Sequence, residues 1–135
     1  MAKTVEQYLQ QAQSDPTTEH IEALWRAVFL LKGWYFLPAQ ADEGPSLPTV
    51  TVIDEEPWLV AFTNIRRLRD FARQVGRVQR GEMHLMVLSP QEALEHLQEV
   101  REQIRGVVFN PRTDETFRAP TEAVFEFADH FGVPL

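Results

Sequence analysis

Apolar residues recur at helical spacing through residues 4–33. Thr4 and Gln7 have the spacing of a capping box, in which each side chain bonds the backbone N–H of the other residue. They predict a first, short helix. Asp15-Pro16 then predicts the cap and first turn of a second helix that ends before Gly33. The broad apolar face of this helix predicts that it is largely buried; the face comprises Ile21, Leu24, Trp25, Val28, Phe29 and Leu31.

The middle of the chain has the pattern of strands. Residues 34–37 read Trp-Tyr-Phe-Leu, which places the tryptophan and phenylalanine on one face of a strand and the tyrosine and leucine on the other. Residues 38–48 contain three prolines and a glycine and predict an exposed loop. Residues 49–53 and 58–63 predict two strands of a hairpin, with the acids at 54–56 forming its tip.

A third helix and a fourth strand follow. Thr63 or Asn64 can cap a helix over residues 65–75, whose apolar positions cover about a third of the helical circumference. Gly76 is expected to end it. Residues 83–88 form an almost continuous apolar run, which predicts a strand covered on both faces.

Ser89, Pro90 and Glu92 give the strongest local signal in the sequence. They combine a capping box with a proline at the first helical position, so a helix must begin there. Near the end of the chain, Pro120 is expected to open a last helix that stops at Gly132.

The stretch between these helices, residues 105–112, reads Arg-Gly-Val-Val-Phe-Asn-Pro-Arg. Its three central residues are strong strand formers. Gly106 lacks a Cβ and allows a close approach to a neighbouring strand. Asn110 can bond its own backbone in an Asx turn, and Pro111 cannot donate to a ladder, so the strand is expected to end at this point.

The order of these elements predicts an α+β fold. A hairpin in the first half implies antiparallel pairing, whereas alternating strands and helices in the second half favour right-handed parallel crossovers. We therefore expect a mixed sheet of about five strands with helices packed on it. A chain of 135 residues is the size of one ordinary domain.

Composition narrows the class of protein. The chain has no cysteine, which excludes disulfides and thiolate chemistry and favours a cytoplasmic location. It has no run of ~18 apolar residues and no secretory signal pattern, so we expect no membrane association. The net charge of −7 argues against a nucleic-acid partner, because phosphate binding requires a basic face.

The charge is nevertheless unevenly distributed. Residues 66–80 contain six of the thirteen basic residues and a single acid, Asp70, which gives this segment a charge of +5. The remainder has seven basic and nineteen acidic residues, a charge of −12. One basic island therefore lies on an acidic protein.

Three features in this order resemble the SseB N-terminal domain family, the enhanced serine sensitivity proteins. They are a helix leading into "WYFLP", the strand and helix start "WLVAFTNIRRLRDFA", and the late "GVVFNP". The resemblance runs from Thr17 to Phe131. It implies a single SseB-like domain over 1–135, with an N-terminal helix in 1–15 and the family core in 16–132.

The resemblance also implies a bacterial protein with an α+β fold and no agreed catalytic residues, so no catalytic motif is carried over. Two features of this chain depart from the longer family members. It ends at Leu135, before their second domain, and it has Arg112 after Asn-Pro where glycine is more typical.

The sharpest candidate for a functional surface is the basic helix. At ~100° per residue, Arg66, Arg69 and Arg73 fall within about 60° of one another, so three guanidinium groups can meet one acidic protein partner. Trp58, close to the hairpin tip, is a second candidate contact. The competing interpretations are a solvated charged face, with Asp70 pairing Arg66, and a tryptophan buried in the core.

A second hypothesis is a small anionic ligand, or an enzyme substrate, held in a pocket at the strand ends by His84, Arg105, Asn110 and Arg112. A third is self-association through the hairpin. The acids at 54–56 lack the ligand spacing of a calcium loop, and no nucleophile motif is present, so we expect no metal, no cofactor and no catalytic set.

Overall fold

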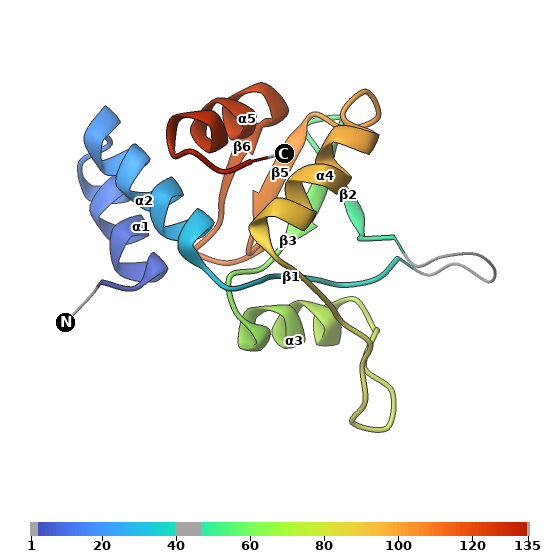
Figure 1. Ribbon diagram of the computed structural model, residues 1–135. Helices are drawn as coiled ribbons and strands as arrows, with labels where there is room; N and C mark the ends of the chain where they lie inside the picture. Colours follow the sequence, from blue (N-terminus) through green and yellow to red (C-terminus); the bar gives the residue numbers. More distant parts are fainter. Residues whose placement is uncertain (1–2, 40–46, 135) are drawn as a thin grey trace.

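A four-stranded mixed sheet forms the centre of the protein in the computed structural model, which describes residues 3–39 and 47–134. Its strand order is β2-β3-β5-β6 (Figure 1). β3 and β5 are parallel, and both outer pairs are antiparallel. The strands are β2 (Val50–Ile53), β3 (Glu56–Ala61), β5 (Gly106–Phe109) and β6 (Phe117–Pro120).

A second, two-stranded sheet pairs β1 (Trp34–Phe36) antiparallel with β4 (Met86–Leu88). It joins the larger sheet through a bridge between Tyr35 and Phe62, whose backbones exchange hydrogen bonds of 3.0 and 2.8 Å. Most of the predicted loop at 38–48 lies outside the described residues.

The described residues form five helices: α1 (Val5–Ser14), α2 (Thr18–Leu30), α3 (Ile65–Gln74), α4 (Pro90–Val100) and α5 (Thr121–His130). In Figure 1, α3 lies below the strands, α5 lies above them and α4 crosses in front of them, while α1 and α2 stand beside α5. The expected α+β class is confirmed. Among the described residues, no helix is long and apolar enough to cross a membrane.

Strand alternation divides the core into two clusters. On β3, Leu59 and Ala61 face the cluster beneath α1, α2, α4 and α5, while Trp58 and Val60 face the cluster beneath α3. The same alternation holds in residues 34–37, where the predicted faces are confirmed. Because side chains of a strand alternate with a period of two, one central sheet serves two apolar layers.

Local capping signals predict the helix starts well. The capping boxes of α1 and α4 are both present, and Asn64 caps α3 through a 2.9 Å bond from the Arg67 N–H. The start of α2 is a correction, because Thr17 and not Asp15 is its cap. The Thr17 hydroxyl accepts the His20 N–H, which removes an otherwise unbonded donor.

Three other expectations are wrong. The strand predicted at 83–88 is reduced to β4, in which Val87 is half exposed, so it is not covered on both faces. It also lies in the small sheet and pairs antiparallel with β1, so the parallel connection in this half of the chain runs from β3 to β5 and not through β4. Finally, β6 lies where a loop was expected. It pairs with β5, its Ala119 is buried, and Pro120 is its last residue.

Gly106→Ala tests the close approach of β5 to its neighbours. A Cβ built on Gly106 would collide with the Ala119 carbonyl oxygen and lie 2.7 Å from both Pro120 Cα and Trp58 Cζ3. Because two of these atoms are backbone, we expect a loss of about 1–3 kcal/mol in the free energy of unfolding, measured by urea denaturation. Gly33→Ala is the matched control, since its Cβ meets the exposed side chain of Val87, which can shift. Equal losses for the two variants would contradict this account.

Glu92→Gln tests the capping box of α4. Hydrogen bonds from the backbone N–H and then the side chain of Ser89 lower the pKa of Glu92 below its ordinary value. A lowered folded-state pKa adds stability above the unfolded-state pKa, and this stability is lost as pH falls through the folded-state pKa. Wild type should therefore exceed Glu92→Gln in urea midpoint at neutral pH, and the two should converge in acid. A difference between the two urea midpoints that persists unchanged in acid would contradict this account.

Candidate functional site

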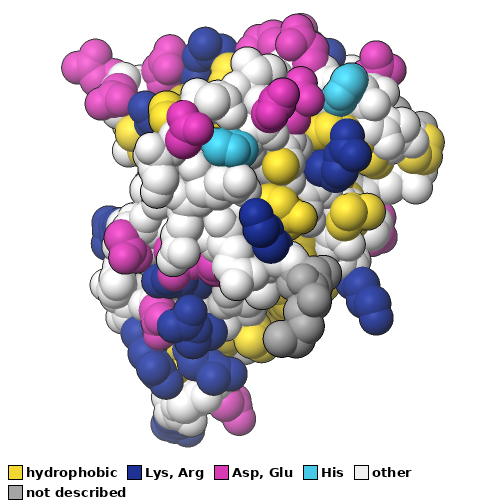
Figure 2. All heavy atoms as spheres, turned by 90° about the vertical axis from the view of Figure 1, so that its left-hand side faces the viewer, with side chains coloured by type: hydrophobic (Ala, Val, Ile, Leu, Met, Phe, Trp, Pro, Cys, Tyr) yellow, Lys and Arg dark blue, Asp and Glu magenta, His cyan; other side chains and the backbone are white. Residues whose placement is uncertain are grey.

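The basic island is presented by α3. The apolar side of α3 packs against the sheet through Leu68, Phe71 and Ala72. The ring centroids of Phe71 and Phe62 are 5.4 Å apart. The opposite face of the helix must then point to solvent. The predicted residues Arg66, Arg69 and Arg73 are all exposed on that face. In Figure 2, Lys and Arg side chains gather at the lower end of the molecule, where α3 lies.

The three arginines are unpaired within the described part of the chain. No ion pair within 4.0 Å involves Arg66, Arg69 or Arg73, and the expected pair of Arg66 with Asp70 is not formed. These guanidinium groups therefore keep their hydrogen-bond donors available to a partner. We call this exposed set of three residues the α3 arginine face.

Arg67 has a different role that the sequence did not reveal. Its side chain is only 13% exposed and forms ion pairs with Glu115 and, at 4.0 Å, with Asp114. These acids lie in the loop between β5 and β6, which the pair ties to α3. Nothing in the sequence distinguishes Arg67 from its exposed neighbours except its angular position, which lies toward the buried side of the helix.

Asn110 ties the ends of the two parallel strands together. It is 1% exposed, its Oδ1 accepts the Thr63 N–H at 3.2 Å, and its Nδ2 donates to Thr63 Oγ1 at 3.1 Å. The expected Asx turn on its own backbone is therefore wrong, since the side chain reaches across to the end of β3. Its φ of 51° lies in the left-handed region, which asparagine tolerates better than most residues.

The same corner is connected to the first helix. Glu6 of α1 accepts hydrogen bonds from Asn64 Nδ2 at 3.1 Å and from Thr63 Oγ1 at 3.4 Å. Gln13 of α1 donates to the backbone oxygen of Asp114. The strand ends therefore carry a structural hydrogen-bond network, and its polar groups are already engaged with one another.

The predicted anionic pocket is not assembled. Arg105 precedes β5 and pairs with Glu56 at 3.6 Å and Glu122 at 3.3 Å, at the end of the strand opposite to Asn110. Arg112 lies over the ring of Phe71, with 5.7 Å from Cζ to the centroid. His84 is exposed in the segment before β4. Arg112 has φ of 65°, a conformation that glycine adopts more easily.

Trp58 is not the exposed contact expected at the hairpin tip. Only 6% of its surface is exposed, and it packs in the cluster beneath α3. The guanidinium of Arg118 covers its ring at 4.7 Å and also pairs with Asp54 at 3.3 Å. Trp58 therefore belongs to the core, which is the competing interpretation weighed from the sequence.

A groove of about 1290 Å³ runs along one side of α3 and was not foreseen. Arg69 lines it from the helix, and Arg77, Arg80 and His84 line it from the chain that follows. Among the described residues, no group of three or more His, Cys, Asp or Glu side chains could hold a metal ion. The chemistry that this region offers is cationic hydrogen bonding.

Comparison of the chain with protein-family models and with curated proteins found no match. The site must therefore be interpreted from its own chemistry. Its two parts differ in kind. Side chains of the strand-end corner bond one another, whereas the α3 arginine face has its donors free within the described residues.

Asn110→Gly and Asn110→Ala together separate the two contributions of this residue. Both variants remove the bonds to Thr63 and leave its buried N–H without a partner, which costs about 1–3 kcal/mol. The alanine variant should lose about 1 kcal/mol more, because φ of 51° is strained for it and not for glycine. Urea denaturation measures both. If the glycine variant matches wild type, the bond between the strand ends contributes nothing.

Proposed function

We propose that this protein is a non-enzymatic binding or regulatory module of the SseB-like class, which captures an acidic protein partner on the α3 arginine face. The observation that supports the proposal most directly is the set of three exposed guanidinium groups with no ion pair among the described residues. The resemblance of three sequence segments to the SseB N-terminal domain family is consistent with such a module.

The chemistry of arginine favours this role. A guanidinium presents a planar fork of donors that matches a carboxylate with two parallel hydrogen bonds. No ion pair with another described residue has to break before the α3 arginine face meets a partner, so the hydrogen bonds gained on binding are not offset by the loss of such a pair. Binding would also relieve the repulsion among three cations on one helix face.

The acidic remainder of the chain does not oppose this binding strongly. At physiological ionic strength, charges more than about 8 Å apart are largely screened, so the basic face acts locally. Over longer distances the net charge of −7 disfavours polyanions such as nucleic acid, which would contact more of the surface than one helix. A compact acidic patch on another protein fits best.

Charge reversal tests the proposal. Affinity capture from a lysate of the source organism should recover a partner with wild type and lose it, by about tenfold or more, with the triple variant Arg66→Glu, Arg69→Glu, Arg73→Glu. The loss follows because each reversal replaces attraction by repulsion toward the same carboxylates. Recovery with wild type should also fall between low and moderate salt.

The matched control is Lys3→Glu, Lys32→Glu, Arg101→Glu, which changes the net charge equally at exposed positions outside α3. This variant should capture the partner as wild type does, and both variants should keep the wild-type circular dichroism spectrum. Equal recovery by the two triple variants would overturn the proposal, because net charge and not the α3 arginine face would then govern capture.

A further inference from the structure

The groove beside α3 is lined by both cationic and apolar side chains. Arg69, Arg77 and Arg80 line it together with one acid, Glu82. Its apolar lining comes from both sides: Ile65, which is 41% exposed at the start of α3, and Met83 and Leu85 from the chain opposite. Ile65 is thus an exposed apolar side chain beside arginines that form no ion pair among the described residues, which is typical of a surface that a partner covers.

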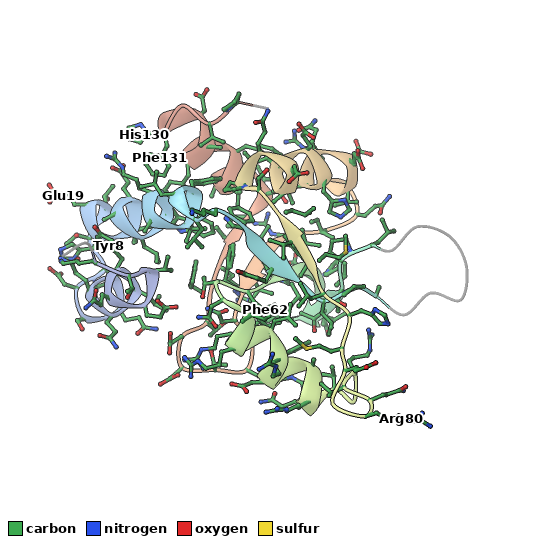
Figure 3. The ribbon with its side chains drawn as sticks, turned by 60° about the horizontal axis from the view of Figure 1, so that its bottom comes forward. Tyr8, Glu19, Phe62, Arg80, His130 and Phe131 are labelled. Carbon is green, nitrogen blue, oxygen red and sulfur yellow. The ribbon has the colours of Figure 1, made fainter. Side chains whose placement is uncertain are left out.

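The wall of the groove is held in place by hydrogen bonds. Gln79 and Glu82 exchange backbone bonds of 2.9 Å around a two-residue turn, in which Arg80 and Gly81 have φ of 54° and 75°. Arg77 Nη1 donates to the Pro38 carbonyl oxygen at 2.8 Å. Arg80 therefore sits at the tip of a braced turn, where it points away from the body of the protein (Figure 3).

The backbone along the groove is available for pairing. Residues 83–85 precede β4 and make no backbone hydrogen bond with another described residue. Backbone N–H and C=O groups that bond no other described residue can serve as a template for an added strand. An added strand would place every second side chain toward the groove.

We propose that this groove binds an extended segment of a partner protein in which acidic and apolar side chains alternate. Its backbone pairs with residues 83–85, its apolar side chains contact Ile65 and Met83, and its carboxylates meet Arg69 and Arg80. The inference rests on the proposed function, and it specifies the partner of α3 further, because Arg69 belongs to both the groove and the α3 arginine face. Alternation fits because a strand presents its two faces with a period of two.

The test uses a fluorescein-labelled peptide of about ten residues with Glu alternating with Leu, Val or Ile, titrated with the full chain by fluorescence anisotropy. Binding is expected, and it should fall when Ser replaces the apolar residues or Lys replaces Glu. A labelled single-stranded oligonucleotide of similar length should bind more weakly. If the oligonucleotide or the Ser-substituted peptide binds as tightly as the original peptide, the proposed alternating segment is wrong.

Two double variants test whether the peptide binds in the groove. Ile65→Gln with Arg80→Glu alters only groove residues and should weaken peptide binding about tenfold. Leu30→Gln with Arg101→Glu makes the same kinds of change at exposed positions outside both α3 and the groove lining, and it should change binding less than about threefold. Circular dichroism and the urea midpoint check that both variants fold.

The outcomes also distinguish this inference from the proposed function. No peptide binding by wild type, together with capture that depends on the α3 arginine face, would overturn the groove and leave the proposed function standing. The reverse result is that the peptide binds in the groove but the triple arginine variant still captures its partner. That result would support the groove and overturn the proposed function in its stated form.

Discussion

The parallel pairing of β3 with β5 is the constraint on which the rest of the structure depends. At its start Trp58 is opposite Gly106, where the absence of a Cβ lets β6 and the indole ring approach. At its end Asn110 bonds Thr63 across the two strand termini. Parallel strands cannot be joined by a tight turn, so register has to come from contacts distant in sequence. Here a glycine and an asparagine provide it, one at each end.

From this pair the two apolar layers follow. Phe109 of β5 faces the helix-rich side, where its ring stacks on Phe117 and meets Trp25 and Trp34 edge-on. The next residue toward the strand start, Val108, faces the opposite cluster. Four of the described helices share the first layer, whereas α3 alone covers the second (Figure 1). Most of the buried apolar side chains therefore lie on the side of the sheet that α1, α2, α4 and α5 cover.

The isolation of α3 explains why its arginines remain exposed. No other described helix packs against its outer face, and its apolar stripe is already used against the sheet. Arg67 is less exposed than these three arginines because it lies toward the loop that contains Glu115. A cationic surface that no other described helix covers thus arises from the same packing that builds the fold. The groove beside it depends on where the chain turns after the helix.

Local signals in the sequence determined the helix starts at Asn64 and Ser89, the two faces of residues 34–37, and the exposure of the three arginines on α3. Each depends on capping chemistry or on a period of 3.6 or 2, which neighbouring residues set by themselves. Only the tertiary structure decided which arginine is buried, that Trp58 lies in the core, that Arg105 and Arg112 flank opposite ends of β5, and that β4 pairs with β1. These features depend on partners far along the chain, and a partner's position is set by packing that no local pattern encodes.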